Sequence, residues 1–156
     1  MANQGDGAVE NLLRSDDPFA VATRNCFACG VENARGLHIR VDLDPTRHEA
    51  WSTVTLTPDL QGWEGVAHGG VVSTLMDEVL CYSLNERRPV FTVELTVRYK
   101  RAVPTGVPLT VRARRTLARG RLMHAEGEIA DADGEVLATA QGKFLMPRGA
   151  DAAGQG

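Results

Sequence analysis

Residues 68–78 read HGGVVSTLMDE, and this stretch predicts the helix on which the rest of the fold depends. Two glycines stand at its start, and Asp77 follows Gly70 by almost two turns, so both lie on one helix face. Backbone N–H groups at a helix start have no intrahelical partner and can hold a carbonyl oxygen that becomes an oxyanion. Helical side chains lean toward the N-terminus, which brings the carboxylate toward the glycines. This spacing is typical of an acyl-transfer site.

The composition is that of a one-domain globular protein: of the 156 residues, 43% are hydrophobic and 24% are charged. No apolar run reaches the length of a membrane span, and residues 1–17 contain neither a basic leader nor an apolar signal core. The three cysteines, an odd number, argue against a disulfide framework and fit a reducing compartment. We therefore expect a cytoplasmic protein that does not insert into a membrane.

Several stretches alternate apolar and polar residues, which predicts strands around the helix. The helix is expected over residues 69–85, and it should be buried because apolar residues cover most of its circumference. Sequential hairpins favour antiparallel pairing, and one apolar helix can bury itself only if the sheet curls around it. The fold class is therefore α+β. The expected strands are 37–43, a second one ending near Thr57, 91–99, 108–116, 122–130 and 135–146, with a loop over 58–67.

Three features together resemble a known family: the HGG motif, an Asp nine residues after its His, and the segment VRYKRAVPTG at 97–106. They are similar to the hotdog-fold acyl-CoA thioesterases, the PaaI-like and 4-hydroxybenzoyl-CoA thioesterase superfamily. The resemblance covers residues 25–147, which leaves 1–24 as a flexible N-terminal segment and 148–156 as a disordered tail. The segment CFACGVENARGLHI at 26–39 is also similar to a branch that includes human acyl-CoA thioesterases.

The resemblance implies a hotdog fold, in which a curved antiparallel sheet wraps around one long central helix. It also implies a homodimer or a dimer of dimers, with each active site at a subunit interface. By position, Asp77 matches the catalytic carboxylate that activates water or attacks the thioester, and the N–H of Gly69 or Gly70 matches the oxyanion donor. His68 opens the motif, and Thr92 matches a Ser or Thr of the partner chain that orients water.

One position departs from the family pattern. Some members carry an Asn six residues before the His, where it contacts the thioester carbonyl, and this chain has Gly62 there. The adjacent Gln61 is a candidate replacement, so the second oxyanion donor stays open.

Each catalytic candidate also has a structural interpretation. The hydroxyls of Ser73 or Thr74 are placed to satisfy a merely structural Asp77. Glu78 is either an alternative base or a solvent-facing or interface charge. His68 is either a general acid or, as we favour, a brace at the helix start. From the alternation alone, Thr92 shares a solvated strand face with Glu94 and Arg98, and only the resemblance makes it functional.

Substrate binding is expected to involve an acyl tunnel and a grip on coenzyme A. From Arg98 to Arg121 the chain has eight Lys or Arg and no Asp or Glu, which suits phosphates but also suits solvated strand edges. Nucleic acid is disfavoured because the chain is acidic overall and lacks an aromatic platform. The candidate substrate-binding residues are Gln61, Trp63, Ser73, Met76, Glu78, Phe91, Arg98, Lys100 and Arg101, with Trp63, Phe91 and Met76 lining the tunnel.

Cys26 and Cys29 have the spacing of metal ligands. A structural zinc usually takes four ligands, and the chain has no second Cys pair, so we expect two partly buried thiols and no metal. The sequence therefore predicts an acyl-CoA thioesterase that needs no metal or organic cofactor, with coenzyme A entering as part of the substrate. The alternatives are a non-catalytic binder of acyl thioesters and a thioesterase that acts on chains held by a carrier protein. A hotdog dehydratase would need a His paired with an acid in another arrangement, which the sequence lacks.

Overall fold

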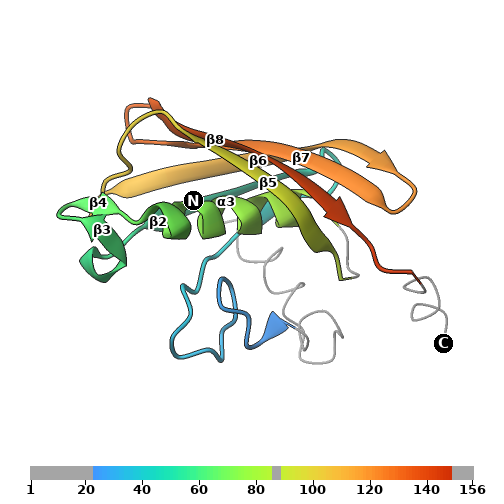
Figure 1. Cartoon of the computed structure of the whole chain (residues 1–156), viewed down its shortest axis with the longest axis horizontal. Helices are drawn as coiled ribbons and strands as arrows, with labels where there is room; N and C mark the ends of the chain where they lie inside the picture. The colour runs from blue at the N-terminus through green and yellow to red at the C-terminus, as the bar shows by residue number, and fades with distance from the viewer. Residues whose placement is uncertain (1–22, 86–88, 149–156) are drawn as a thin grey trace, which may run out of the picture.

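The computed structural model describes residues 23–85 and 89–148, in which an antiparallel sheet curls around the helix α3 (Gly69–Ser83) (Figure 1). The strand order in the sheet is β1-β2-β6-β7-β8-β5, and every neighbouring pair is antiparallel. This arrangement confirms the predicted α+β hotdog architecture. The strands are β1 (Asp42–Asp44), β2 (Glu49–Thr55), β5 (Phe91–Tyr99), β6 (Pro108–Arg119), β7 (Leu122–Ala130) and β8 (Val136–Leu145).

The helix α3 is buried on the side that faces the sheet, where it packs against β6, β7 and β2. Its opposite side is only half-buried and carries polar side chains such as Ser73, Asp77 and Glu78. The expectation of a helix buried nearly all round is therefore wrong, because the sheet covers one side only. The helix residues that face the sheet and are fully buried are Val72, Leu75, Met76, Val79 and Leu80.

Two segments differ from their predicted structure. Residues 37–41 are not a strand, because the N–H groups of Leu37 and Ile39 donate to carbonyls of Phe27 and Ala28 in the preceding loop. The predicted loop 58–67 contains a 3-10 helix, η1 (Pro58–Leu60), and a small hairpin of β3 (Gln61–Trp63) and β4 (Val66–Ala67). The predicted flexible ends lie almost wholly outside the described residues.

None of the helices in the described ranges is both long and apolar enough to cross a membrane.

The core depends on close packing of Phe144 between the sheet and α3. This side chain is fully buried, and a Cβ added at Gly142 would lie 2.6 Å from its ring. Phe144→Ala should therefore lower the free energy of unfolding by ~3–5 kcal/mol, measured by urea denaturation at fixed protein concentration. Leu117→Ala is the matched control, since Leu117 is 39% exposed and should lose much less. Equal losses in the two variants would contradict this account of the core.

Candidate active site

The imidazole of His68 caps the start of α3. Its Nδ1 accepts a hydrogen bond from the Gly70 N–H at 2.9 Å, so His68 is the N-cap of the helix. The His68 carbonyl accepts from the N–H groups of Val71 and Val72. The N–H of Gly69 donates to no described residue, and Gly69 is exposed. Of the two glycines that the sequence left open, Gly69 therefore presents the free amide.

Tyr99, which the sequence analysis did not single out, fastens the first turn of α3 to the last residue of β5. Its hydroxyl donates to the Gly69 carbonyl at 2.8 Å and lies 2.6 Å from the Ser73 hydroxyl. These bonds fix the peptide next to the free amide. The sequence contains a signal that could have identified Tyr99. It is the last residue of a stretch in which apolar and polar residues alternate, and it shares a strand face with Leu95 and Val97, which point toward the helix.

Asp77 lies almost two turns further along α3 and is half-buried. Its Oδ1 accepts a hydrogen bond from the Thr92 hydroxyl at 2.9 Å. Burial raises the pKa of Asp77, and the hydrogen bond from Thr92 lowers it by less. The Thr74 hydroxyl instead donates to the Gly70 carbonyl, and Ser73 contacts Tyr99, so neither of the two predicted structural partners satisfies this carboxylate.

A β-bulge in β5 brings Thr92 to the helix. Thr92 is opposite the buried Phe144 of β8, whereas Glu94 is opposite Lys143 on the outer face, and Val93 is the extra residue between them. Directly opposed residues in an antiparallel pair share a face, so Thr92 points toward α3 and Glu94 points away. The alternation had placed both on one solvated face, which is wrong because a bulge shifts the period by one residue.

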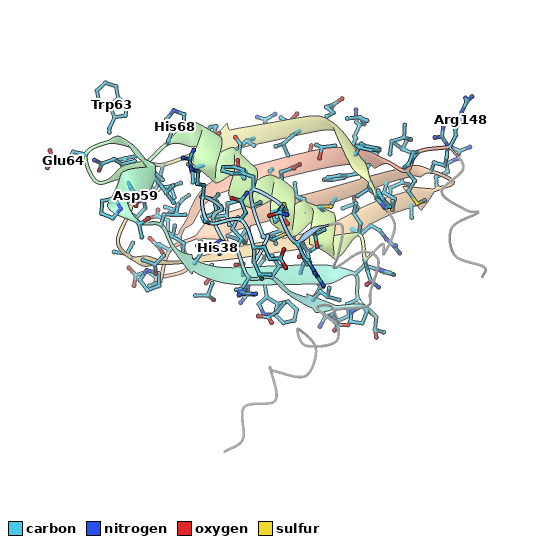
Figure 2. All side chains as sticks on the ribbon, turned by 90° about the horizontal axis from the view of Figure 1, so that it is seen from below. His38, Asp59, Trp63, Glu64, His68 and Arg148 are labelled. Atoms are coloured by element: carbon cyan, nitrogen blue, oxygen red, sulfur yellow. The ribbon has the colours of Figure 1, made fainter. Side chains whose placement is uncertain are left out.

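Of the predicted substrate residues, Gln61 and Trp63 belong to the hairpin beside the helix start. The Gln61 Oε1 accepts from the Gly65 N–H at 3.1 Å and so stabilises the β3–β4 turn, with its amide N–H groups still available. Figure 2 shows Trp63 projecting from the tip of this hairpin and His68 beside the start of α3; Trp63 is 82% exposed. Phe91 is also exposed, but Met76 is fully buried in the core and therefore lines no open surface in this chain.

The predicted basic residues Arg98, Lys100 and Arg101 have different surroundings. Arg98 is opposite Thr139 and shares the outer face of the sheet with Thr96, where both line a groove of about 1010 Å³ that includes no residue of α3. Arg101 forms an ion pair with Glu135 at 2.7 Å, and Lys100 is exposed. Within this chain the structure does not bring Arg98 to the helix start.

Glu78, the other candidate base, has different surroundings from Asp77. It is half-buried and accepts a hydrogen bond from the Cys29 thiol. Burial raises the pKa of Glu78, this hydrogen bond lowers it by less, and repulsion from Asp77 adds to the rise. Within this chain Glu78 is thus engaged by the N-terminal loop and not by the helix start.

One protein-family model matches this chain. The family model described as the thioesterase superfamily matches residues 64–138, which include the helix start, Asp77 and Thr92. This match covers 75 of the 156 residues and shows that the chain is similar to the thioesterase superfamily. The branch suggested by residues 26–39 is not resolved by this match and stays a prediction. A comparison with curated proteins finds no match.

Solved structures of this thioesterase fold align over most of the chain. A thioesterase superfamily protein is 25% identical, with 92% of this chain and 86% of that chain covered and a TM-score of 0.70. The E. coli PaaI protein from the phenylacetic acid degradation operon is 22% identical (70% and 83% covered, TM-score 0.64). A hypothetical thioesterase from Streptococcus pneumoniae TIGR4, solved with coenzyme A, is 15% identical (70% and 85% covered, TM-score 0.64).

The clamp at the helix start gives a testable expectation. Tyr99→Phe removes the hydroxyl that bonds to Gly69 and Ser73, so it should lower the free energy of unfolding by ~0.5–1.5 kcal/mol and speed hydrogen exchange of amides in the first helical turn. Urea denaturation and hydrogen–deuterium exchange measure the two effects. Ser73→Ala is the control, because it leaves the bond to Gly69 in place and should change exchange less. Unchanged exchange in Tyr99→Phe would contradict the clamp.

Proposed function

We propose that this protein hydrolyses an acyl-CoA thioester to a carboxylic acid and free coenzyme A. The observation that carries the proposal is the pairing, on one helix, of a free amide at Gly69 with a half-buried carboxylate at Asp77. The match to the thioesterase superfamily model supports thioester hydrolysis in general. The coenzyme A in the S. pneumoniae structure supports coenzyme A as the carrier, and a chain held by a carrier protein is the alternative substrate.

The proposed reaction uses Asp77 as a general base. Its carboxylate takes a proton from a water molecule, whose oxygen forms a bond to the thioester carbonyl carbon. The Gly69 N–H holds the resulting oxyanion, with help from the helix dipole. Collapse of this intermediate breaks the C–S bond, and the proton passes from Asp77 to the departing thiolate. Burial favours this role, because a carboxylate with a raised pKa is a stronger base.

Direct attack by Asp77 is the other route, and it would pass through an acyl anhydride that water then hydrolyses. The two routes differ in where an oxygen label appears. Single turnover in ¹⁸O-labelled water leaves label in the Asp77 side chain only if the anhydride forms and water attacks its Asp77 carbonyl carbon, whereas the general-base route never labels Asp77. The Thr92 hydroxyl is suited to both routes, since it fixes the carboxylate by a hydrogen bond at 2.9 Å.

We also propose that the working form is a homodimer joined through β5. This strand is an edge of the sheet, and it carries exposed apolar side chains at Phe91 (59%), Val93 (55%) and Tyr99 (50%). An edge strand with exposed apolar residues is a ready template for pairing with a second chain. Such a dimer would cover β5 close to Asp77, because Thr92 belongs to this strand.

Asp77→Asn should leave a folded protein and lower the turnover number by ~10²–10⁴-fold, because the amide cannot accept a proton from water. A panel of acyl-CoAs with a thiol-detecting dye measures the rate, and circular dichroism checks the fold. Asp133→Asn, which changes an exposed carboxylate in the β7–β8 turn, is the control and should keep full activity. Comparable hydrolysis by Asp77→Asn would exclude the proposed base, and a wild type that binds the panel without hydrolysis would favour a non-catalytic binder.

Val93→Asp should convert the dimer to a monomer, because it places a charge on the exposed β5 edge. Analytical ultracentrifugation at several protein concentrations gives the mass. Leu117→Asp changes an exposed apolar residue of β6 instead and should leave the dimer intact. A wild type that is monomeric at all concentrations would refute the dimer, as would a Val93→Asp variant with unchanged mass.

A further inference from the structure

A cluster of thiols and a carboxylate lies beside α3, and the proposed hydrolysis makes no use of it. The Sγ atoms of Cys26 and Cys29 and a carboxylate oxygen of Glu78 all lie within 4.8 Å of one another. All three residues are partly buried, and Cys81, the remaining cysteine of the sequence, follows one turn after Glu78 on α3. The loop and the helix thus bring together residues that are about fifty positions apart in the chain.

The loop that carries the two thiols is tightly built. The Gly30 N–H donates to the Cys26 carbonyl at 2.9 Å, and a Cβ added at Gly30 would lie 2.4 Å from the Cys26 nitrogen. Only glycine therefore fits directly after the second cysteine. The side chain of Ala28, between the thiols, is 5% exposed in the core, and its carbonyl accepts from the Ile39 N–H. These contacts hold both thiols against the helix, which is the kind of preorganisation that a metal site needs.

No Lys, Arg or His among the described residues forms an ion pair with Glu78. Burial raises the pKa of Cys29, and the Glu78 charge raises it further, while burial followed by the Glu78 charge raises the pKa of Cys81 to about 12. A buried carboxylate without a cation is costly, and a divalent ion would remove that cost.

We propose that Cys26, Cys29 and Glu78 bind one Zn²⁺ ion. Zn–S bonds of ~2.3 Å in a tetrahedron place two ligand sulfurs ~3.8 Å apart, so a small contraction of the present cluster suffices. Two thiolates and a carboxylate suit this borderline-soft ion, and binding would release the protons of the thiols. The fourth position is left for water, since Cys81 lies outside the group whose ligand atoms are within 4.8 Å.

This assignment reverses the expectation from the sequence, which counted cysteines and found no second pair. The third ligand is a carboxylate of α3, and only the folded chain places it beside the Cys-X-X-Cys loop. The ion would fasten this loop to the helical turn that contains Asp77. The proposal does not depend on the hydrolysis, and its test therefore measures metal binding and stability.

The experiment uses the full chain without a histidine tag, kept reduced, loaded with Zn²⁺ and passed through gel filtration. We expect one zinc per chain by elemental analysis, and removal of the ion by a chelator should lower the melting temperature. Replacement by Co²⁺ should give the visible bands of a tetrahedral ion and a near-ultraviolet thiolate-to-cobalt band. Cys26→Ser, Cys29→Ser and Glu78→Gln should each bind zinc more than ~100-fold more weakly.

Two matched controls separate ligand loss from general damage. Cys81→Ser removes a thiol outside the group, and Glu64→Gln neutralises an exposed carboxylate on the β3–β4 hairpin, so both should keep one zinc per chain. Circular dichroism of each variant without metal checks that it folds. A wild type that retains no zinc, or a Cys81→Ser variant that loses zinc as completely as Cys26→Ser, would overturn the assignment.

Discussion

Burial of one side of α3 by the curved sheet is the constraint on which the rest of the molecule depends. Fully buried residues such as Leu75 and Leu80 fix the rotation of the helix about its own axis. Once that rotation is set, the half-buried positions Asp77 and Glu78 must face away from the sheet. Hydrophobic packing therefore determines where the polar side chains of α3 lie, although the packed residues themselves do not contact a substrate.

The helix start is set by a different kind of interaction. The first backbone N–H groups of the helix have no acceptor within it. The His68 ring accepts from the Gly70 N–H, and the His68 carbonyl accepts from the N–H groups of Val71 and Val72. The amide of Gly69 is left over, and the Tyr99 hydroxyl orients the adjacent carbonyl. A free donor at a fixed angle is what oxyanion stabilisation requires, since it costs no reorganisation during the reaction.

Sequence patterns predicted the local structure well wherever one face of an element is buried. The predicted bounds of β5 (91–99) and β7 (122–130) match the structure, and the HGG motif located the helix start. The alternation gave a wrong prediction where contacts with a distant segment determine the structure. Residues 37–41 alternate like a strand, yet they pair with residues 27 and 28 of a loop. The periodicity of a segment shows which of its faces is apolar, but it does not show which other segment it pairs with.

The site was predictable to the same extent. Asp77 and the glycines lie within one helix, so their geometry follows from the helical repeat. Thr92 depends on the bulge at Val93, and no feature of the alternating sequence marks that extra residue. Arg98 was grouped with coenzyme A by composition, but the strand register turns it to the outer face. The convergence of Cys26 and Cys29 on Glu78 is a tertiary contact, which counting residues of one type along the chain cannot reveal.

Asp77 and Glu78 illustrate how adjacent residues of one helix acquire different chemistry. They are about 100° apart around the axis, so they meet different segments of the chain. Burial raises the pKa of both, but Asp77 is partnered by a hydroxyl of the edge strand and Glu78 by a thiol of the N-terminal loop. The hydroxyl leaves the Asp77 carboxylate able to accept a proton, whereas the thiols bring metal-binding atoms to Glu78. The charge of Asp77 raises the pKa of Glu78 as well, so the two neighbours interact although their partners differ.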